Sequence, residues 1–406
     1  MATPAIGSSV LTRRGVLAAA ASTLLLSACG RDEGRDGGTA GPPAGFGELV
    51  VGVSLELTGP GATLGVPQER ALRITADTLN EYGVPVGNQR LKIRLEVRDN
   101  GSDPRLAARH AAELATRDDV HALLGATLAE TSLGIIRVAQ RVRVPYLSLA
   151  YGDGIVHPLA DRTFVYKVTP DAEQLATRLV TLLKEQSRHR VALLAGHGLH
   201  GDSGVAAIGA AVDSAGLHLA VTSRLPATGT SFLTAARAVV RKAPDAVVIW
   251  ANAPDSGAAA RALRQAGYRG RLYFDAAGVA EDTLDERNAP AVEGAYAVHP
   301  LSLGDSTLTN TSTGALALRD LSSRYLHRYG SYRGFAPYAS DALTLIVGAA
   351  RAAGSLDRGR VRAYLRNQGI EGMTGAYAFE PNKHSGLDPS ALGIYRVINS
   401  GWNRIS

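Results

Sequence analysis

Short apolar runs alternate with amphipathic stretches along the chain from residue 48 onward. The runs have the length of single β-strands and are bounded by residues that favour turns. They cover residues 49–55, 91–97, 120–125, 145–149, 191–195, 246–250 and 272–274. Between them, apolar residues recur at helical spacing over residues 68–82, 104–114, 132–141, 174–187, 204–215, 256–267 and 337–353. This alternation predicts an α/β fold of doubly wound parallel sheets, covered by helices on both faces.

The loops at the carboxyl ends of the predicted strands are where we expect a ligand. In doubly wound sheets, ligands bind in the crevice outside these ends. The residues that close the strands before these loops are Leu55, Gly125, Leu149, Ala195, Trp250 and Phe274. Side chains in the segments that follow them are therefore the first candidates for a binding site.

The first thirty residues have the pattern of an export signal. Arg13 and Arg14 precede an apolar run over residues 16–26, which is too short for a comfortable membrane span. Small residues and then Cys29 follow, and together they resemble the lipobox of bacterial lipoproteins. The resemblance implies that a signal peptide of residues 1–28 is removed and that Cys29 is lipidated. We therefore expect an extracytoplasmic protein, anchored to the cell membrane and exported by the Sec or the twin-arginine route.

The composition narrows the class of protein further. Residues 29–47 contain little that a core could bury, which predicts a flexible linker, and the remaining length suffices for two domains. Cys29 is the only cysteine, so we expect no disulfide and a stability that comes from the cores. The formal net charge is +6, but no dense basic tract and no aromatic residues interleaved with arginines are present. We therefore expect no nucleic-acid partner.

A set of motifs, in one order across nearly the whole mature chain, gives a more specific resemblance. The motifs are Leu57-Thr58-Gly59-Pro60-Gly61-Ala62, Asp99 with Asp103-Pro104, Leu124-Gly125, Val144-Pro145-Tyr146-Leu147-Ser148, Gly372-Met373-Thr374-Gly375 through Phe379, Asn382, Gly386, Tyr395 and Gly401-Trp402. With them, the chain resembles the branched-chain amino-acid (Leu/Ile/Val)-binding family of periplasmic binding proteins, which have the type I fold. Such proteins capture the ligand for an ATP-binding-cassette (ABC) importer.

The resemblance implies two α/β lobes joined by three hinge crossings, near residues 165–169, 295–300 and 375–380. The first lobe would consist of residues 48–165 and 296–376, and the second of residues 166–295 and 377–406. A small-molecule ligand would lie between the lobes, and their closure would deliver it to an ABC permease in the membrane. We expect a monomer that is not an enzyme and needs no cofactor and no metal.

Comparison with the family's ligand site identifies candidate contacts and two departures. In the family, the loop after the third strand of the first lobe holds a ligand carboxylate with its amides and hydroxyls, an arrangement that favours anions. Here Ala129 stands where relatives that bind amino acids carry a serine, and Ala277 stands near the position of the acid that pairs with the ligand ammonium. A buried unpaired ammonium is costly, so a branched-chain amino acid is not the expected ligand. The candidate contacts are Thr127, Ala129, Thr131, Tyr151, His200, Asp202, Trp250, Asn252, Asp275 and Tyr338.

Two alternatives from other classes stay open at this point. A ligand-sensing receptor lipoprotein of the same fold would have the same sequence features. An extracytoplasmic hydrolase would need a nucleophile and a base, for which Ser203 with His200 is the one candidate pair; the surrounding residues resemble the nucleophile segment of chymotrypsin-type proteases. His197 and His200 could hold a metal together, but no third ligand lies nearby in the sequence.

Overall fold

The computed structural model describes residues 46–117, 119–227, 231–303, 310–367 and 369–406. The predicted signal peptide, Cys29 and the linker up to residue 45 lie outside the described residues. Among the helices that the structure describes, none is both long and apolar enough to cross a membrane.

The first sheet has six strands in the order β2-β3-β1-β4-β5-β6. β1 pairs in parallel with both β3 and β4, and β2 is antiparallel to β3. The strands are β1 (Gly47–Leu55), β2 (Val84–Val86), β3 (Gln89–Asp99), β4 (Val120–Gly125), β5 (Tyr146–Ser148) and β6 (Val165–Lys167). β1 lies between β3 and β4 inside the sheet, so most of its length is buried. Because the three strands are parallel, the carboxyl end of β1 is flanked by those of β3 and β4.

The second sheet has seven strands in the order β15-β14-β11-β10-β9-β7-β8. Its strands are β7 (Arg190–Ala195), β8 (His218–Arg224), β9 (Ala246–Trp250), β10 (Arg271–Phe274), β11 (Tyr296–Pro300), β14 (Leu392–Ile398) and β15 (Gly401–Arg404). β7 to β11 run parallel, while β14 and β15 form an antiparallel ribbon against β11. The C-terminal residues thus close one edge of this sheet.

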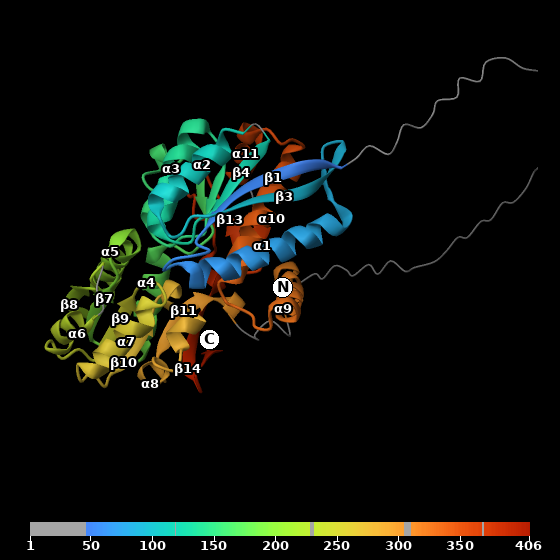
Figure 1. Cartoon of the computed structure of the whole chain (residues 1–406). Helices are drawn as coiled ribbons and strands as arrows, with labels where there is room; N and C mark the ends of the chain where they lie inside the picture. The colour runs from blue at the N-terminus through green and yellow to red at the C-terminus, as the bar shows by residue number, and fades with distance from the viewer. Residues whose placement is uncertain (1–45, 118, 228–230, 304–309, 368) are drawn as a thin grey trace, which may run out of the picture. The chain divides into compact units, whose positions relative to one another are not determined.

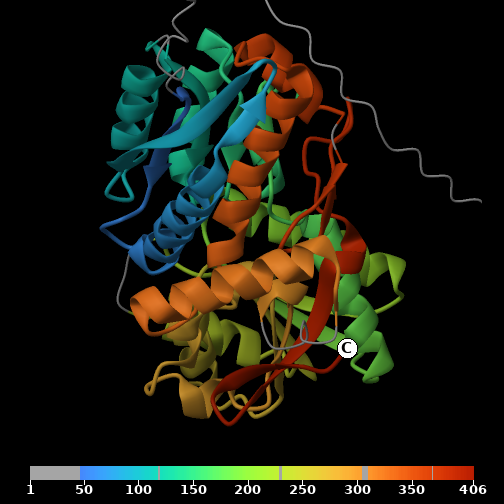
Figure 2. The ribbon, with the colours of Figure 1, turned by 90° about the vertical axis from the view of Figure 1, so that its right-hand side faces the viewer.

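Helices cover both faces of each sheet, as the sequence predicts (Figures 1 and 2). On the first sheet, α2 and α3 pack on one face and α1 and α10 on the other. On the second, α4 and α5 cover one face and α6 and α7 the other. The helices are α1 (Ala62–Tyr82), α2 (Pro104–Ala115), α3 (Ala129–Val142), α4 (Ala172–Glu185), α5 (Gly198–Ser214), α6 (Leu233–Val240), α7 (Asp255–Gln265), α8 (Ala289–Val292), α9 (Thr313–Tyr329), α10 (Ala336–Ala353) and α11 (Arg358–Leu365). We call each sheet with the helices packed on it a lobe.

The chain passes between the lobes more than once. It leaves the first sheet after β6 and enters the second at β7, and it returns after β11 to form α10, which packs on α1. It then forms the small pair β12 (Gly369–Glu371) and β13 (Ala376–Ala378) before it rejoins the second sheet at β14. β11 belongs to the second sheet, so the chain leaves that lobe after Pro300, whereas the resemblance starts the first lobe's second segment at residue 296.

α5 begins at Gly198, although the glycines at its start predict a loop up to residue 203. These glycines serve close packing. A Cβ atom on Gly204 would lie 2.4 Å from Cδ1 of Trp250, and one on Gly201 would lie 1.9 Å from the carbonyl oxygen of Gly196. Glycine therefore lets the helix approach the end of β9, which outweighs its low helix propensity. As a result, His200 lies in the first turn of a helix, and Asp202 follows directly after that turn.

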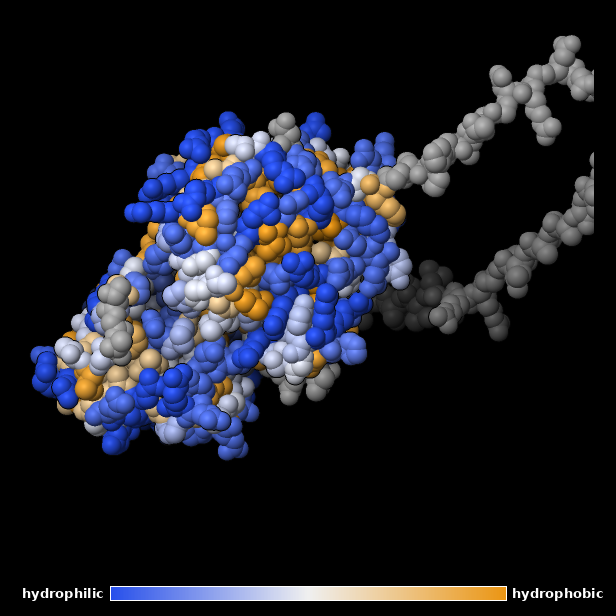
Figure 3. Space-filling model, viewed as in Figure 1, coloured by the Kyte–Doolittle hydropathy of each residue, from blue (hydrophilic) through white to orange (hydrophobic). Residues whose placement is uncertain are grey.

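The molecular surface is mixed in polarity. On the face shown in Figure 3, hydrophilic residues predominate, and apolar residues gather in a band over the half that contains β1 and α1. The large apolar side chains with substantial exposure are scattered along the chain at Phe46, Tyr82, Leu316, Leu326, Tyr364, Ile398 and Ile405.

Candidate functional site

Six aromatic side chains meet where the carboxyl ends of the two sheets face each other. Tyr151, which follows β5 of the first sheet, has its ring centroid 5.7 Å from that of His200 on α5. His200 lies 5.7 Å from Trp250, at the end of β9. We call the set the aromatic cluster; its members are Tyr151, His200, Trp250, His299, Phe335 and Tyr338, all of them buried. Both lobes contribute to it, so the cluster joins them.

The two tyrosines of the cluster are joined by their hydroxyl groups. Tyr151 Oη and Tyr338 Oη lie 2.7 Å apart. Burial raises the pKa of Tyr151 and of Tyr338 above the usual value for a phenol, so both stay protonated at ordinary pH. His299 packs 6.2 Å from Tyr338, and burial lowers its pKa to about 4, which leaves the imidazole neutral. This part of the cluster is therefore uncharged.

Asp275 holds the second lobe's side of the site in place. Its Oδ1 accepts a hydrogen bond from Ala251 N at 3.1 Å, and its Oδ2 accepts one from Ala277 N at 3.0 Å. Oδ2 also lies 3.0 Å from Nε2 of His200, although the two atoms lack the alignment of a hydrogen bond. Asp275 is completely buried and so fixes the loops after β9 and β10 against α5.

Glu56, directly after β1, is the carboxylate of the first lobe's side. Its Oε2 accepts a hydrogen bond from Thr127 N at 2.8 Å, and its Oε1 accepts one from Leu128 N at 3.3 Å. Thr131 Oγ1 also donates to Oε1. Glu56 is completely buried, and the neighbouring Gln68 on α1 contacts Thr127 Oγ1 at 2.5 Å. The hydroxyls and amides that the resemblance assigns to a ligand carboxylate thus already contact a carboxylate of the chain.

Five polar atoms around this site are buried and have no hydrogen-bond partner among the described residues. They are Gln68 Nε2, Nδ1 and Nε2 of His200, Trp250 Nε1 and His299 Nε2. Folded proteins rarely leave buried polar atoms unpartnered, because each such atom costs free energy. Atoms of the same kind occur elsewhere in the described chain, and those around this site are candidates for contacts with a polar ligand.

The other residues expected to contact the ligand lie at the border of this arrangement. Ala129 is buried as the first residue of α3, and Asn252 is partly exposed after β9, where its carbonyl accepts a hydrogen bond from Ser256 N. Asp202 is different, since its carboxylate is 66 % exposed and lies 2.7 Å from Nη2 of Arg224. The structure thus brings Tyr151, His200, Trp250, Asp275 and Tyr338 together, places Thr127 and Thr131 around Glu56, and leaves Asp202 at the surface.

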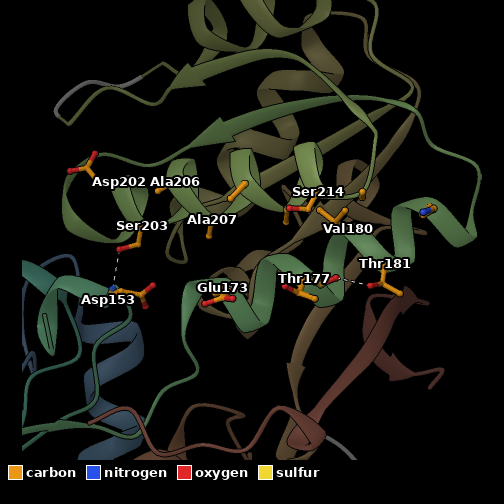
Figure 4. Close-up of a pocket in the computed structure, with 14 residues that line it drawn as sticks. Asp153, Glu173, Thr177, Val180, Thr181, Asp202, Ser203, Ala206, Ala207 and Ser214 are labelled. Atoms are coloured by element: carbon orange, nitrogen blue, oxygen red, sulfur yellow. Dashed lines mark hydrogen bonds between the residues drawn. The ribbon is translucent and has the colours of Figure 1, made fainter. Parts of the chain in front are cut away.

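Asp202 lines a separate groove between α4 and α5. This groove has a volume of about 780 Å³, and its floor consists of small apolar residues such as Val180, Ala207 and Ala211 (Figure 4). Ser203 lies at one end, where its Oγ accepts a hydrogen bond from Asp153 N at 2.9 Å. Because Asp153 belongs to the first lobe and Ser203 to α5, this bond also joins the lobes.

The pair Ser203 and His200 is not arranged as a nucleophile with its base. Ser203 Oγ donates its proton to the carbonyl oxygen of Leu199, at 3.0 Å, and His200 faces Asp275. A hydroxyl has only one proton to donate, so none is left for the imidazole. Within the described residues, no group of three or more His, Cys, Asp or Glu side chains could hold a metal ion, so His197 and His200 form no part of one.

Lys167, at the end of β6, lies where the chain passes from the first lobe to the second. It is completely buried, and its Nζ lies 3.2 Å from Asp153 Oδ1 and 3.1 Å from Asp171 Oδ1. Burial opposes the charge, yet the two carboxylates hold the pKa of Lys167 above its usual value. The crossing is thus held by an ion triad, in which the ammonium is buried and the two carboxylates are 32 % and 22 % exposed.

Four residues of the site are not among the candidates from sequence: Glu56, Gln68, His299 and Phe335. Glu56 has a recognisable signal, since a single acid stands between Leu55 and Leu57 at the end of a buried strand. Phe335 and His299 come from α10 and β11, whose contribution to the cluster depends on the return of the chain between the lobes. No local pattern indicates that return.

Comparison with known proteins agrees with this architecture. A family model described as periplasmic binding protein matches residues 48–400. An extracellular ligand-binding receptor from Rhodopseudomonas palustris HaA2 is 22 % identical, with 88 % of this chain and 99 % of that chain covered and a TM-score of 0.79. A leucine-binding protein, LivK, from Thermotoga maritima is 18 % identical, with 88 % and 98 % covered and a TM-score of 0.77.

A solute-binding protein of an ABC transporter from Rhodopseudomonas palustris BisB5, solved in complex with 3,4-dihydroxybenzoic acid, is 16 % identical; it covers 88 % of this chain and 96 % of its own, with a TM-score of 0.75. At these identities the solved structures show a shared fold, and the family model extends over nearly all of the described body. The members of that family are binding proteins rather than enzymes. With its two lobes of doubly wound sheets and a family match over residues 48–400, this chain belongs to the periplasmic binding protein family and has its type I fold.

Proposed function

We propose that this protein is a lipid-anchored, extracytoplasmic solute-binding protein that captures a small ligand between its lobes and delivers it to the permease of an ABC importer. The observation that carries the proposal is the aromatic cluster, which both lobes build and which is accompanied by unpartnered buried polar atoms. A site divided between two lobes can bind tightly only when the lobes are closed, so closure reports that the ligand is bound.

The lobes that we propose to close are those that the resemblance implies, residues 48–165 with 296–376 and residues 166–295 with 377–406, except that β11 (Tyr296–Pro300) moves from the first lobe to the second. The proposed anchor is a lipid on Cys29, joined to the body by residues 29–47. The proposed contacts on the first lobe come from the loops after β4 and β5, with Tyr338 on α10. Those on the second come from His200, Trp250 and Asp275.

The ligand that we propose is an amide-bearing or aromatic molecule rather than a branched-chain amino acid. Ala277 is completely buried, and its amide is bonded to Asp275, so no acid stands there to pair with an α-ammonium group. Relatives of the same fold include a protein solved with isoleucine and the protein solved with 3,4-dihydroxybenzoic acid. The aromatic cluster offers ring faces, which favour an aromatic ligand or a cation.

The test is a thermal-shift screen of the purified full chain in detergent against amino acids, amides, polyamines, nucleobases and aromatic acids. A ligand that binds only the folded protein raises its melting temperature by mass action. The proposal expects a shift of several degrees with one chemical class, together with a smaller radius of gyration in solution scattering. If the branched-chain amino acids gave the largest shift, the proposed ligand class would be wrong.

Delivery to a permease is tested separately from binding. The ligand found in the screen, in labelled form, should accumulate in cells that contain the gene and not in cells from which it is deleted. Unchanged uptake in the deletion strain, with binding intact, would favour the ligand-sensing receptor over the transport protein.

A further inference from the structure

The amino-terminal end of α3 has the features of an anion-binding helix end. Thr127 N and Leu128 N lie at the amino-terminal end of the helix, where backbone amides and the helix dipole favour negative charge. Both amides donate to one carboxylate, that of Glu56, which is 71 residues away from Thr127 in the sequence. A second feature of the same place is Gln68 Nε2, which is buried and has no partner within the described chain.

We propose that Glu56 is a resident anion, which fills the anion site of the first lobe and makes the protein reject ligands that carry a carboxylate there. The ligand class that follows is a neutral or cationic aromatic molecule with hydrogen-bond acceptors. This inference rests on the proposed function, because it assumes that a ligand binds between the lobes.

The space for Glu56 is built into the start of α1. A Cβ atom on Gly61 would lie 2.8 Å from Cγ of Glu56, and one on Gly65 would lie 2.2 Å from its carbonyl oxygen. Any larger residue at either position would force Glu56 to move. Gly61, which precedes α1, thus leaves room for the side chain of Glu56, and Gly65 leaves room for its backbone. In this position the carboxylate accepts three hydrogen bonds from the next loop and the start of α3.

The loop after β4, whose amides donate to Glu56, is bonded to the loop that carries Tyr151 of the aromatic cluster. Leu149 N donates a hydrogen bond to the carbonyl oxygen of Ala126, which ties the loop after β5 to the loop after β4. Tyr151 of the cluster follows two residues after Leu149 in the chain. The loop that carries Tyr151 is therefore bonded directly to the loop whose amides Glu56 occupies.

The charges around the site add to the exclusion of anions. Asp275 is a second completely buried carboxylate, and the described side chain that faces it is His200. The buried ammonium of Lys167 is paired with Asp153 and Asp171. An anionic ligand would thus lose its hydration and meet two buried carboxylates, which raises the free energy of binding.

The unpartnered atoms indicate what the ligand must offer instead. Gln68 Nε2 can only donate a hydrogen bond, because an amide nitrogen has no acceptor capacity. A ligand that reaches it must therefore present an acceptor, such as a carbonyl oxygen or a ring nitrogen. Together with the ring faces of Tyr151 and Tyr338, this describes a flat molecule with acceptors and without a carboxylate.

The first experiment asks whether Glu56 fills an anion site. Glu56→Ala in the full chain removes the carboxylate and leaves the amides of Thr127 and Leu128 open, so millimolar propionate should raise the melting temperature of this variant. Propionamide, which has nearly the same shape without the charge, should not. Wild-type protein and the surface control Glu81→Ala, whose carboxylate pairs with Arg324 in solvent, should not respond to either compound. Equal responses to propionate in all three proteins would overturn the proposal.

If Glu56→Ala folds only when propionate is present, this dependence shows that the anion site has been refilled. If Glu56→Ala never folds, Glu56→Gln, which keeps the shape and removes the charge, takes its place in the comparison of ligands that follows. An unchanged preference of Glu56→Gln among those ligands would overturn the proposal.

The second experiment asks which member of matched ligand pairs binds. Benzoate with benzamide and phenylalanine with phenylalaninamide differ in the carboxylate alone or nearly so. Wild-type protein should show the larger thermal shift with the amide of each pair, and Glu56→Ala and Glu56→Gln should reduce or reverse this preference. A wild-type preference for the carboxylates would falsify the inference while leaving the proposed function intact. If no compound of any class shifts the wild-type protein, the proposed function fails, and the propionate experiment still decides about Glu56.

Discussion

The hydroxyl of Tyr151, which follows β5, lies 2.7 Å from the hydroxyl of Tyr338 on α10, and both side chains are buried. The two residues are 187 positions apart in the sequence, so the bond ties the start of α10 to the end of the first sheet. It also fixes the two rings that face the second lobe.

Replacing one of these tyrosines by phenylalanine should cost more than replacing both. Tyr338→Phe leaves the hydroxyl of Tyr151 buried without its partner, which costs about 1–3 kcal/mol of unfolding free energy. In the double variant with Tyr151→Phe, no hydroxyl is left unsatisfied, so its stability should be closer to that of the wild type than the sum of the single effects. Urea unfolding of the four proteins measures this coupling; strictly additive effects would contradict it.

Lys167→Met should destabilise the protein strongly. The substitution leaves the carboxylates of Asp153 and Asp171 without their buried counter-charge. Breaking a fully buried pair costs about 3–5 kcal/mol, and because both carboxylates are partly exposed, the expected cost lies at the lower end of that range. The matched control is Arg324→Met, which removes an exposed cation from Glu81 and Asp320 and should cost at most about 1 kcal/mol. Free energies of unfolding in urea would show the difference, and similar values for both variants would argue against a stabilising role of the triad.

Asp341 on α10 should make the protein less stable as the pH rises. Burial raises its pKa from 3.8 to about 6, although hydrogen bonds from Thr374 and from Met373 N oppose the rise. The folded protein therefore binds a proton that the unfolded chain releases between about pH 4 and pH 6. The protonated carboxyl of Asp341 contributes about 3 kcal/mol to the free energy of unfolding. This contribution is fully present below pH 4, decreases as the pH rises, and is lost once the pH has passed 6.

The measurement is the free energy of unfolding against pH for the wild type and for Asp341→Asn. Other groups titrate equally in both proteins, so the difference between the curves isolates Asp341. A difference that stays constant from pH 4 to pH 7 would show that its carboxyl titrates normally.

Two glycines of α5 should respond to alanine in opposite directions. A Cβ atom on Gly204 would lie 2.4 Å from two ring atoms of Trp250, so Gly204→Ala should destabilise by about 1–3 kcal/mol. Nothing lies within 4 Å of a Cβ atom on Gly209, so Gly209→Ala should stabilise by up to about 1 kcal/mol through helix propensity. Thermal unfolding of both variants tests the pair; a loss at Gly209 as large as that at Gly204 would contradict the packing argument.

Cys29→Ser should release the protein from membranes. The substitution removes the sulfur that the proposed lipid modifies, and the described body has no helix that could span a membrane in its place. Fractionation of cells that express the wild type and the variant is the measurement. If the variant stays in the membrane fraction to the same extent, the protein is held there by something other than a lipid on Cys29.

The central strands of both sheets could be predicted from sequence because their apolar runs are continuous. The runs at 120–125 and 246–250 coincide with β4 and β9. β8 could not be found in this way, since it is an edge strand whose residues are partly exposed and mixed in polarity. α9 was also missed, because exposed leucines such as Leu316 and Leu326 blur its amphipathic pattern.

The site was accessible from sequence only in part. Tyr151, Trp250 and Asp275 were indicated because they follow or end strands, and the rules of parallel sheets bring such positions together. Glu56 was not, because its role depends on amides 71 positions further along the chain, and an acid at a strand end usually faces water.

Asp153 joins the two lobes, and this connection has a consequence for the rate at which a ligand can bind. Its amide is bonded to Ser203 on the second lobe, and its carboxylate accepts from Lys167 and from Ala172 N. These contacts hold the two lobes together, so under the proposed function a molecule that binds at the buried cluster must wait until they break. At high ligand concentration the speed of capture is then set by the opening of the protein and no longer by diffusion.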